Sequence, residues 1–295
     1  MVLKFSVITP SYNQGRFIDR TIQSVIKQSD RHFDYLICDG GSTDETLGII
    51  QQYEGQLTWL SECDRGQADA VNKGISRTTG EIIAWLNSDD IYYPQTLQTV
   101  REIFTTYPQV QVVYGDADII DADDNAIASY PTHSWNYHYL KQICYLCQPA
   151  VFFRRQLVDK YGTLDSCLEY CMDYELWLRY GAKTPFYYLP QKLAASRSYS
   201  ANKTNRCKVA VHAEINKMLD NRLGYVPDRW ILGYARILTD ENWHNLSHTS
   251  QGDRDYINTV IVNCYREFTK WQKVPSLYSC LRLFYWWIQA LINPI

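Results

Sequence analysis

The residues best suited to metal or acid–base chemistry follow one short apolar run. Residues 82–86 are all apolar, as is typical of a strand buried on both faces. The polar segment 87–90 comes directly after it and contains Asp89 and Asp90. Carboxylates at the end of a buried strand suit a hard divalent cation, and α/β sheets bind ligands beyond such ends. The alternative is a loop with a helix cap ahead of Pro94, and the two aspartates alone do not decide between them.

The elements that must position these residues alternate along the N-terminal part of the chain. Apolar residues at helical spacing separate short apolar runs, so parallel strands joined by right-handed crossovers are expected. Ser42 and Glu45 fit a capping box, which predicts a helix start at that point. The predicted fold is α/β with helices on both faces of the sheet, and its strands are expected at 5–10, 35–38, 57–60, 82–86 and 110–114.

Polar clusters stand at the ends of the first four predicted strands. They comprise residues 9–13, 39–44, 64–67 and 87–90. The carboxyl ends of parallel strands share one edge, so we expect these clusters to converge on one crevice. No Gly-x-Gly-x-x-Gly follows the first strand and no Gly-Lys-Ser/Thr is present, which disfavours dinucleotide oxidoreductases and P-loop enzymes. A bound pyrophosphate would therefore need a metal and basic side chains.

The composition is that of an ordinary globular protein with a large core. The chain has 295 residues, of which 46% are hydrophobic and 21% charged. Its net charge of −3 provides no basic excess for phosphates, so no nucleic-acid partner is expected. The nine scattered cysteines suit a reducing compartment, and a strand is expected from Lys4, which leaves no room for a signal peptide. We therefore expect a cytoplasmic protein.

The pattern changes after Asp116. Strands are expected at 119–120, 126–130, 148–153 and 186–189, helices at 155–161 and 174–180, and a polar, mobile stretch at 195–204. Residues 206–295 are expected to form a helical extension to a domain of residues 1–205. Leu277, Leu281, Phe284, Ile288 and Leu291 share one helical stripe. The polar residues in 277–295 argue against a membrane span, so that helix either packs on the body or contacts a membrane surface, peripherally, or a partner.

Two lesser features each leave two interpretations open. Cys144 and Cys147 form a Cys-x-x-Cys without a second pair, which favours buried thiols over a zinc site. Trp135, Tyr137 and Tyr139 suit either stacking on the apolar face of a sugar ring or packing in the core.

Four motifs together resemble one protein family. They are residues 6–13 (SVITPSYN), 39–44 (DGGSTD), 87–90 (NSDD) and 172–177 (MDYELW). In this order they are similar to the inverting, A-type, nucleotide-sugar-dependent glycosyltransferases of family two, over roughly residues 3–205. The resemblance implies a Rossmann-like sheet, mixed but mainly parallel, of the A-type glycosyltransferase kind, with a helical C-terminal extension.

The resemblance also implies binding roles for the donor. Pro10 and Tyr12 would flank the base, and Asp39 would pair with its imide N–H. Asp64 and Arg65 match the stretch near the ribose, the phosphates and the donor sugar.

The same resemblance assigns the metal ligand and the base. Asp90 would be the metal ligand, for Mn²⁺ or Mg²⁺, with Asp89 near the donor sugar or the ribose. Ser88 stands where many members have another Asp, which lowers the number of ligands. Asp173 aligns with the catalytic base, although a carboxylate at a helix start is also a common N-cap.

Basic residues in the polar stretch after 194 are the last part of the implied site. Arg197 and Lys203 lie where family members often place an Arg and then a His near the diphosphate, and Tyr199 replaces that His. A basic side chain there would close over the diphosphate as a lid. The alternative is a solvated charged loop.

The function that follows is metal-dependent transfer of a sugar, with inversion, from a nucleotide-sugar donor to an acceptor hydroxyl in glycan or polysaccharide synthesis. A UDP-sugar is the expected donor, and a saccharide or lipid-linked saccharide the expected acceptor. Two alternatives stay open: a sugar nucleotidyltransferase, which would need a Gly-rich phosphate loop with a Lys, and a non-catalytic nucleotide-sugar-binding module.

Overall fold

The computed structural model describes residues 2–243 and 250–292, and the chain in it divides into two compact units. Unit 1 comprises residues 1–140 and 144–200, and unit 2 comprises residues 141–143 and 201–295. The sequence placed a boundary between 205 and 206, five residues beyond the end of unit 1.

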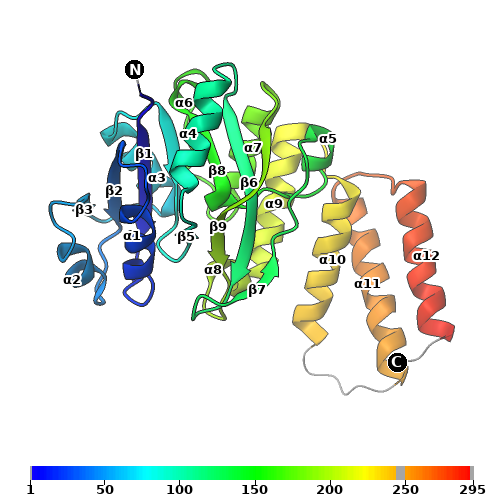
Figure 1. Ribbon diagram of the computed structural model, residues 1–295. Coiled ribbons are helices and arrows are strands. Elements are labelled where there is room, and N and C mark those ends of the chain that lie inside the picture. Colours follow the sequence, from blue (N-terminus) through cyan, green and yellow to red (C-terminus); the bar gives the residue numbers. More distant parts are fainter. Residues whose placement is uncertain (1, 244–249, 293–295) are drawn as a thin grey trace. The chain divides into compact units, whose positions relative to one another are not determined.

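Unit 1 contains a nine-stranded sheet in the described residues, in the order β3-β2-β1-β4-β8-β6-β9-β5, with β7 paired to β6 (Figure 1). Strands β1, β2, β3 and β4 are parallel to one another, whereas β8 is antiparallel to both β4 and β6. The strands are β1 Phe5–Ser11, β2 Phe33–Asp39, β3 Thr58–Ser61, β4 Ile82–Trp85, β5 Ile91–Tyr92, β6 Val112–Ile120, β7 Ala126–Ser129, β8 Val151–Arg154 and β9 Tyr187–Arg197.

This arrangement corrects the expectation of five strands in simple parallel succession. The strand predicted at 110–114 is part of β6, which runs to Ile120 and is separated from β4 by β8. Likewise, β9 continues past Leu189 to Arg197, so residues 195–197 belong to the sheet and not to a mobile loop. A mixed, mainly parallel sheet was the overall prediction, and it is confirmed.

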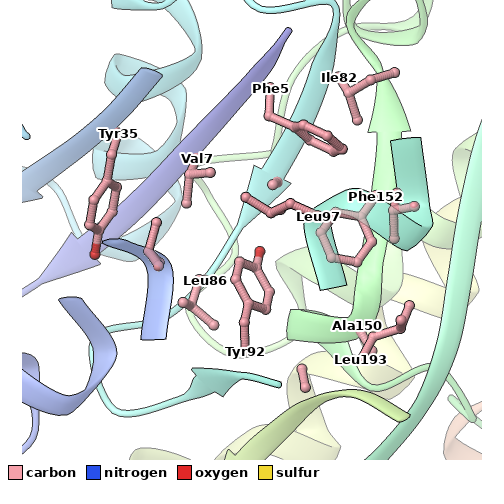
Figure 2. Close-up of a cluster of buried hydrophobic side chains, with 14 of the residues drawn as sticks. Phe5, Val7, Tyr35, Ile82, Leu86, Tyr92, Leu97, Ala150, Phe152 and Leu193 are labelled. Atoms are coloured by element: carbon pink, nitrogen blue, oxygen red, sulfur yellow. The ribbon is translucent and has the colours of Figure 1, made fainter. Parts of the chain in front are cut away.

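The sheet has a continuous apolar core, because its central strands are buried on both faces. Every residue of β1 and β4 is buried. Phe5, Val7, Ile82, Leu86 and Phe152 are among the side chains drawn in Figure 2, and each is fully buried. Burial of a large apolar side chain contributes roughly 1.5–3 kcal/mol, so these contacts fix the strands that end at the polar edge.

Helices of unit 1 connect the strands. They are α1 Ile18–Ile26, α2 Thr46–Gln51, α3 Gln67–Arg77, α4 Thr96–Thr106, α5 Tyr137–Leu140, α6 Arg155–Tyr161 and α7 Met172–Gly181, with a 3₁₀ turn η1 at Gln148–Ala150. The predicted capping box is wrong, because the Ser42 hydroxyl donates to Asp39 and α2 begins only at Thr46. Asp44 accepts the Thr46 N–H instead, at 3.0 Å.

Unit 2 is helical in its described part, as expected. Its helices are α8 Lys203–Arg206, α9 Lys208–Leu223, α10 Asp228–Trp243, α11 Ser250–Lys270 and α12 Leu277–Ile292 (Figure 1). Ile231, Ala235, Val260, Cys264 and Leu283 join α10, α11 and α12 in one buried cluster. Across the described residues, no helix is both long and apolar enough for a membrane span.

Candidate active site

The four polar segments predicted to converge do follow neighbouring strand ends. Ser11 at the end of β1 pairs with Asp39 at the end of β2, and Asp39 pairs with Ser61 at the end of β3. On the other side of β1, Ile8 pairs with Trp85 at the end of β4. All four strands are parallel, so residues 11–13, 39–44, 62–67 and 87–90 lie along one edge of the sheet. This edge is the candidate active site.

Asp39 organises the loop that follows β2. Its buried carboxylate accepts hydrogen bonds from the backbone N–H groups of Gly41 and Ser42, at 3.0 and 2.9 Å, and from the hydroxyls of Ser42 and Ser61. These four donors hold the carboxylate rigidly, which suits a preorganised recognition group. The predicted pairing of Asp39 with a base imide remains a prediction.

The loop after β1 presents Tyr12 beside this carboxylate. Tyr12 is 60% exposed, whereas Pro10 is buried within β1. Asn13 lies in the left-handed region with φ 52° and is bonded to the next loop, since its N–H donates to Ser42 Oγ at 2.8 Å. The Thr43 N–H donates back to Asn13 Oδ1 at 2.9 Å. The two loops are thus locked together, with the Tyr12 ring free to meet a ligand.

Asp64 and Arg65 follow β3 at the same edge. The Asp64 carboxylate accepts the Gly66 N–H at 2.8 Å and lies so close to Gly40 that a Cβ there would be only 2.8 Å from it. The Arg65 side chain is 80% exposed and pairs with Asp69 at 3.2 Å. An exposed guanidinium with one weak ion pair can turn to an anionic ligand at little cost.

Asn87 holds the segment after β4 in place through several hydrogen bonds. The sequence had not indicated a role for this residue. Its Oδ1 accepts from Gln67 Nε2 at 2.6 Å and from Trp85 Nε1 at 2.8 Å. Its amide donates to Gln148 at 2.9 Å and to Asp90 Oδ2 at 3.3 Å. With donors and acceptors engaged, Asn87 shapes the segment and leaves direct ligand binding to its neighbours. Gln67 belongs to the predicted polar cluster 64–67, whereas no motif in the sequence pointed to Gln148.

Asp89 and Asp90 are consecutive but have different surroundings. Asp90 is buried, and its Oδ1 accepts the backbone N–H of Arg197 at 2.8 Å. Asp89 is partly exposed, and its Oδ2 accepts the Tyr199 hydroxyl at 3.2 Å. Burial raises the pKa of both carboxyl groups, and the Asp89 carboxylate further raises the pKa of Asp90. A cation or a hydrogen-bond donor at this position would favour the ionised forms.

Arg197 is not on a mobile loop. Its side chain is fully buried at the end of β9, and its guanidinium lies 4.8 Å from the centre of the Phe17 ring. Arg197 Nε donates to the Asp89 carbonyl at 2.7 Å and Nη1 to the Asp121 carbonyl at 2.7 Å. The predictions that Arg197 lies on a lid or in a solvated charged loop are therefore both wrong. Pairing of β9 and contacts with residues distant in the chain bury its side chain. Its predicted contact with the donor would require a change of conformation.

Asp173 lies in the first turn of α7. The N-cap is Cys171, so Asp173 is not the cap, and its Oδ1 accepts the Tyr174 N–H at 2.7 Å. Burial raises the pKa of Asp173 to about 6. Burial is also the main cause of the raised pKa of the Cys147 thiol, and the carboxylates of Asp90 and Asp173 raise it further.

The aromatic segment before η1 packs against α7. Trp135 stacks on Phe186 with ring centres 4.2 Å apart and covers Gly181. The Tyr137 hydroxyl donates to the Leu178 carbonyl at 3.2 Å, and the Tyr174 hydroxyl to the Leu140 carbonyl at 2.6 Å. For Trp135 and Tyr137 the structure therefore favours core packing over sugar stacking, and this packing holds the helix that bears Asp173.

A metal at this edge would be held by few protein ligands. Within the described ranges, no three His, Cys, Asp or Glu residues gather as a metal site would require, and Cys144 and Cys147 have raised thiol pKa values. Zinc is thus disfavoured there. Mg²⁺ and Mn²⁺ instead accept one or two carboxylates together with substrate phosphates. Asp89 fits that set, because it is partly exposed and Tyr199 occupies only one of its oxygens.

This combination of sheet order, acids at the ends of β2, β3 and β4, and a partly buried acid on α7 defines an A-type glycosyltransferase fold. Residues 6–162 match the family described as glycosyl transferase family 2. The chain therefore belongs to that family.

Known proteins that are similar to this chain include uncharacterised glycosyltransferases and a chondroitin synthase. An uncharacterised glycosyltransferase of Rickettsia prowazekii is 27% identical over 249 residues, covering 80% of this chain and 73% of that protein. Chondroitin synthase of Escherichia coli is 24% identical over 229 residues, covering 74% of this chain and 33% of that enzyme. Across five Rickettsia and Nostoc relatives, the matched region spans between 39% and 73% of the relative's length.

A solved structure shows the same fold. Residues 1–349 of S. aureus TarS, in complex with UDP-GlcNAc, superpose with a TM-score of 0.61 at 17% identity. The match covers 88% of this chain and 82% of the TarS chain. At this identity the likeness concerns the fold.

Proposed function

We propose that this family 2 glycosyltransferase transfers a hexose from a UDP-sugar to an acceptor hydroxyl with inversion, during polysaccharide synthesis. The observation that supports this most is a pair of unlike acid sites: the Asp89–Asp90 segment after β4, and Asp173 in the first turn of α7, whose pKa burial raises to about 6. Two carboxyl sites with different environments can divide the tasks of donor binding and proton removal. The names of chondroitin synthase and of the UDP-GlcNAc complex of TarS favour the same donor and product classes.

Asp173 is proposed to act as the general base. Its carboxylate would take the proton of the acceptor hydroxyl while that oxygen attacks the anomeric carbon. The bond between the anomeric carbon and the diphosphate oxygen breaks at the same time, and UDP leaves with the bonding electrons. Attack from the face opposite to UDP inverts the configuration. A pKa near 6 makes Asp173 a stronger base than an ordinary carboxylate and keeps it ionised at pH 7.

The edge at β1, β2 and β3 is proposed to bind the donor. Tyr12 and Pro10 would flank the uracil, Asp39 would accept its imide N–H, and Asp64 and Arg65 would face the ribose and phosphates. Mn²⁺ or Mg²⁺, when bound, would stabilise the charge that develops on the leaving diphosphate. Asp89 is favoured over Asp90 as the metal ligand. Asp90 is buried, and its carboxylate already accepts hydrogen bonds from Arg197 and Asn87.

A nucleotidyltransferase is disfavoured by the loop after β1. Three consecutive backbone N–H groups there already have side-chain acceptors: Asn13 on Ser42, Gln14 on Thr46 and Gly15 on Asp44. They do not form the free N–H cradle that a phosphate loop needs. The UDP titration and the transfer assays described next also test whether the chain is a non-catalytic binding module.

Titration of UDP with and without Mn²⁺, followed by hydrolysis and transfer assays over a panel of nucleotide sugars, tests the proposal. We expect UDP binding that strengthens with Mn²⁺ and turnover of at least one UDP-sugar. Binding without any turnover over the panel would instead identify a binding module, and absence of UDP binding would contradict both readings of the site.

The α12 helix supports a peripheral contact with a membrane, which would bring a lipid-linked acceptor to the enzyme. Leu277, Leu281 and Phe284 recur at i, i+4 and i+7 and are each more than half exposed, while Leu283 is buried. Residues 277–288 include Tyr, Trp and Arg282 but no acidic residue, as suits an anionic lipid surface. Co-sedimentation with vesicles containing anionic lipid should decrease for Leu281→Glu. Equal sedimentation of the variant would contradict the contact, and cytoplasmic location stays a prediction.

A further inference from the structure

Arg197 contacts the Asp89–Asp90 segment in two ways, through its buried guanidinium and through its backbone. Its Nε donates to the Asp89 carbonyl at 2.7 Å, and the backbone N–H of the same residue donates to the Asp90 carboxylate at 2.8 Å. Both of its contacts there are with the residues proposed to face the metal and the diphosphate. The position of Arg197 therefore helps to set the position of that segment.

Asp124 provides the charge that a buried guanidinium requires. It lies in the turn between β6 and β7, and its Oδ1 pairs with Arg197 Nη2 at 2.5 Å and with Arg20 Nη1 at 3.0 Å. The Asp124 side chain is 35% exposed, while that of Arg197 is 0% exposed. Leaving a buried cation without its partner is strongly unfavourable, so Asp124 helps to fix the orientation of Arg197.

Backbone contacts hold the turn itself. Arg197 Nη1 donates to the Asp121 carbonyl at 2.7 Å, and Arg20 Nη1 to the Ala122 carbonyl at 3.0 Å. The Asp121 carboxylate accepts the N–H groups of Asp123 and Asn125, at 2.8 and 2.9 Å, which closes the turn. Asp124 adopts a φ of 71° in it. The turn therefore presents the Asp124 carboxylate in a defined place.

We infer that Asp124 is a positioning residue for the active site: through Arg197 it holds the Asp89 carbonyl and the Asp90 carboxylate in the geometry that binds the divalent cation and the donor diphosphate. This inference rests on the metal and donor proposed above. Asp124 is not itself proposed to bind the ligand. Side chains that orient a metal ligand affect metal affinity about 10- to 100-fold when they are removed.

A second buried ion pair of unit 1 provides a matched control. Arg101 Nη2 pairs with Asp30 Oδ1 at 2.6 Å, both side chains are 11% exposed, and the Arg101 guanidinium lies 5.3 Å from the centre of the Phe5 ring. This pair has the same chemistry as Arg197 with Asp124 against Phe17. It stands beside Phe33, at the start of β2, away from the strand ends that bear the site.

The experiment compares Asp124→Asn with Asp30→Asn in the full chain. Binding of Mn²⁺ in the presence of UDP is followed by electron paramagnetic resonance, binding of UDP without metal by calorimetry, and Tm by differential scanning fluorimetry. We expect Asp124→Asn to weaken Mn²⁺ binding about 10- to 100-fold while UDP affinity without metal is unchanged. Asp30→Asn should lower Tm comparably and leave Mn²⁺ binding unchanged.

The possible outcomes distinguish a failure of the inference from a failure of the proposed function. Wild-type affinity for Mn²⁺ in Asp124→Asn, or an equal loss in both variants, would overturn the positioning role alone. A loss of metal-free UDP binding in Asp124→Asn would also overturn it, because the damage would then not be specific to the cation. Wild-type protein that binds UDP without any effect of Mn²⁺ would overturn the inference together with the proposed metal.

Discussion

The hydroxyl of Tyr199 donates a hydrogen bond of 3.2 Å to the carboxylate of Asp89, 110 positions earlier in the chain. Burial, and then the Asp89 carboxylate, raise the pKa of Tyr199 to about 12, so the phenol remains protonated near neutral pH. The Tyr199 ring packs on Phe17 with ring centres 4.8 Å apart. At the position where family members often have a His, this chain therefore has Tyr199. Its hydroxyl is a hydrogen-bond donor that stays neutral at physiological pH.

Tyr199→Phe should weaken metal-dependent donor binding while leaving the fold intact. The ring contact with Phe17 is retained, whereas the hydroxyl that donates to Asp89 is lost. Loss of one hydrogen bond to a charged group predicts a rise of about tenfold in the Mn²⁺ concentration at half-maximal activity. Steady-state kinetics over a Mn²⁺ series would measure it.

Tyr93→Phe is the matched control for this change. The Tyr93 hydroxyl donates to Asp118 at 2.6 Å, which is also a phenol–carboxylate pair but on residues that sequence and structure leave outside the site. The Mn²⁺ dependence of Tyr93→Phe should match that of the wild type. If both variants shift equally, the Tyr199 contact has no particular role in the active site.

Asp173→Asn should abolish transfer while UDP affinity is retained. The amide has nearly the same shape and can still accept the Tyr174 N–H, but it cannot take a proton from the acceptor. General-base catalysis contributes typically about 10²- to 10⁴-fold, so kcat should fall by that range. Calorimetry with UDP and a transfer assay on the same preparation would separate the two effects.

Asp165→Asn provides a control nearby in the chain, since Asp165 caps an exposed turn through the Cys167 N–H. It should retain wild-type kcat. A comparable loss of UDP binding and transfer in Asp173→Asn would show that Asp173 is structural and would remove the base from the mechanism.

Transfer should depend on pH through Asp173. Because burial raises its pKa to about 6, the reactive ionised form is lost as pH falls through about 6. We expect kcat to fall tenfold per pH unit below that value, with a slope of one. Transfer rates at saturating donor between pH 5 and 8 would measure it. A profile unchanged down to pH 5 would exclude Asp173 as the base.

Much of the sheet edge was predictable, because it depends on local signals. The apolar runs at Phe5 and Ile82, and the polar segments after them, are enough to place acids at strand ends. The antiparallel strand β8 was predicted as a strand, but not its place between β4 and β6. A short apolar run specifies burial and does not specify which neighbour it pairs with.

Arg197 shows what the sequence could not indicate. The polar residues around it suggested a mobile loop, yet β9 continues through Arg197 by pairing with β6 beyond a register shift near Asp116. Its burial depends on Phe17 and Asp124, which come from segments distant in the chain. Only the tertiary structure brings these partners together, so the charge pattern alone suggested the wrong environment.

Asp173→Asn should also stabilise the protein near neutral pH. A carboxyl group whose pKa is higher in the folded than in the unfolded state destabilises the fold once it is ionised. That cost should be absent below the unfolded pKa of about 4 and complete above about 6, reaching roughly 3 kcal/mol. Asn removes it, so the Tm of the variant should exceed that of the wild type at pH 7.5. The difference should shrink towards pH 4, and a Tm difference independent of pH would contradict the raised pKa.

Asp39→Asn should weaken the fold and the recognition of uracil together. The Asp39 carboxylate accepts from Gly41, Ser42 and Ser61, and an amide nitrogen cannot accept the donors on the Oδ2 side. Unsatisfied buried groups of this kind cost roughly 1–3 kcal/mol, which thermal unfolding would detect. If Asp39 also accepts the imide N–H, the wild type should prefer UDP over CDP, whose base lacks that donor.

Ser61→Ala separates these two roles of Asp39. It removes one of the donors that hold the carboxylate but leaves the charge in place, so stability should fall slightly while the preference for UDP over CDP persists. In Asp39→Asn the preference should disappear. Competition calorimetry with the two diphosphates measures it, and an unchanged preference in Asp39→Asn would assign base recognition to another residue of this edge, leaving Asp39 as the organiser of the loop after β2.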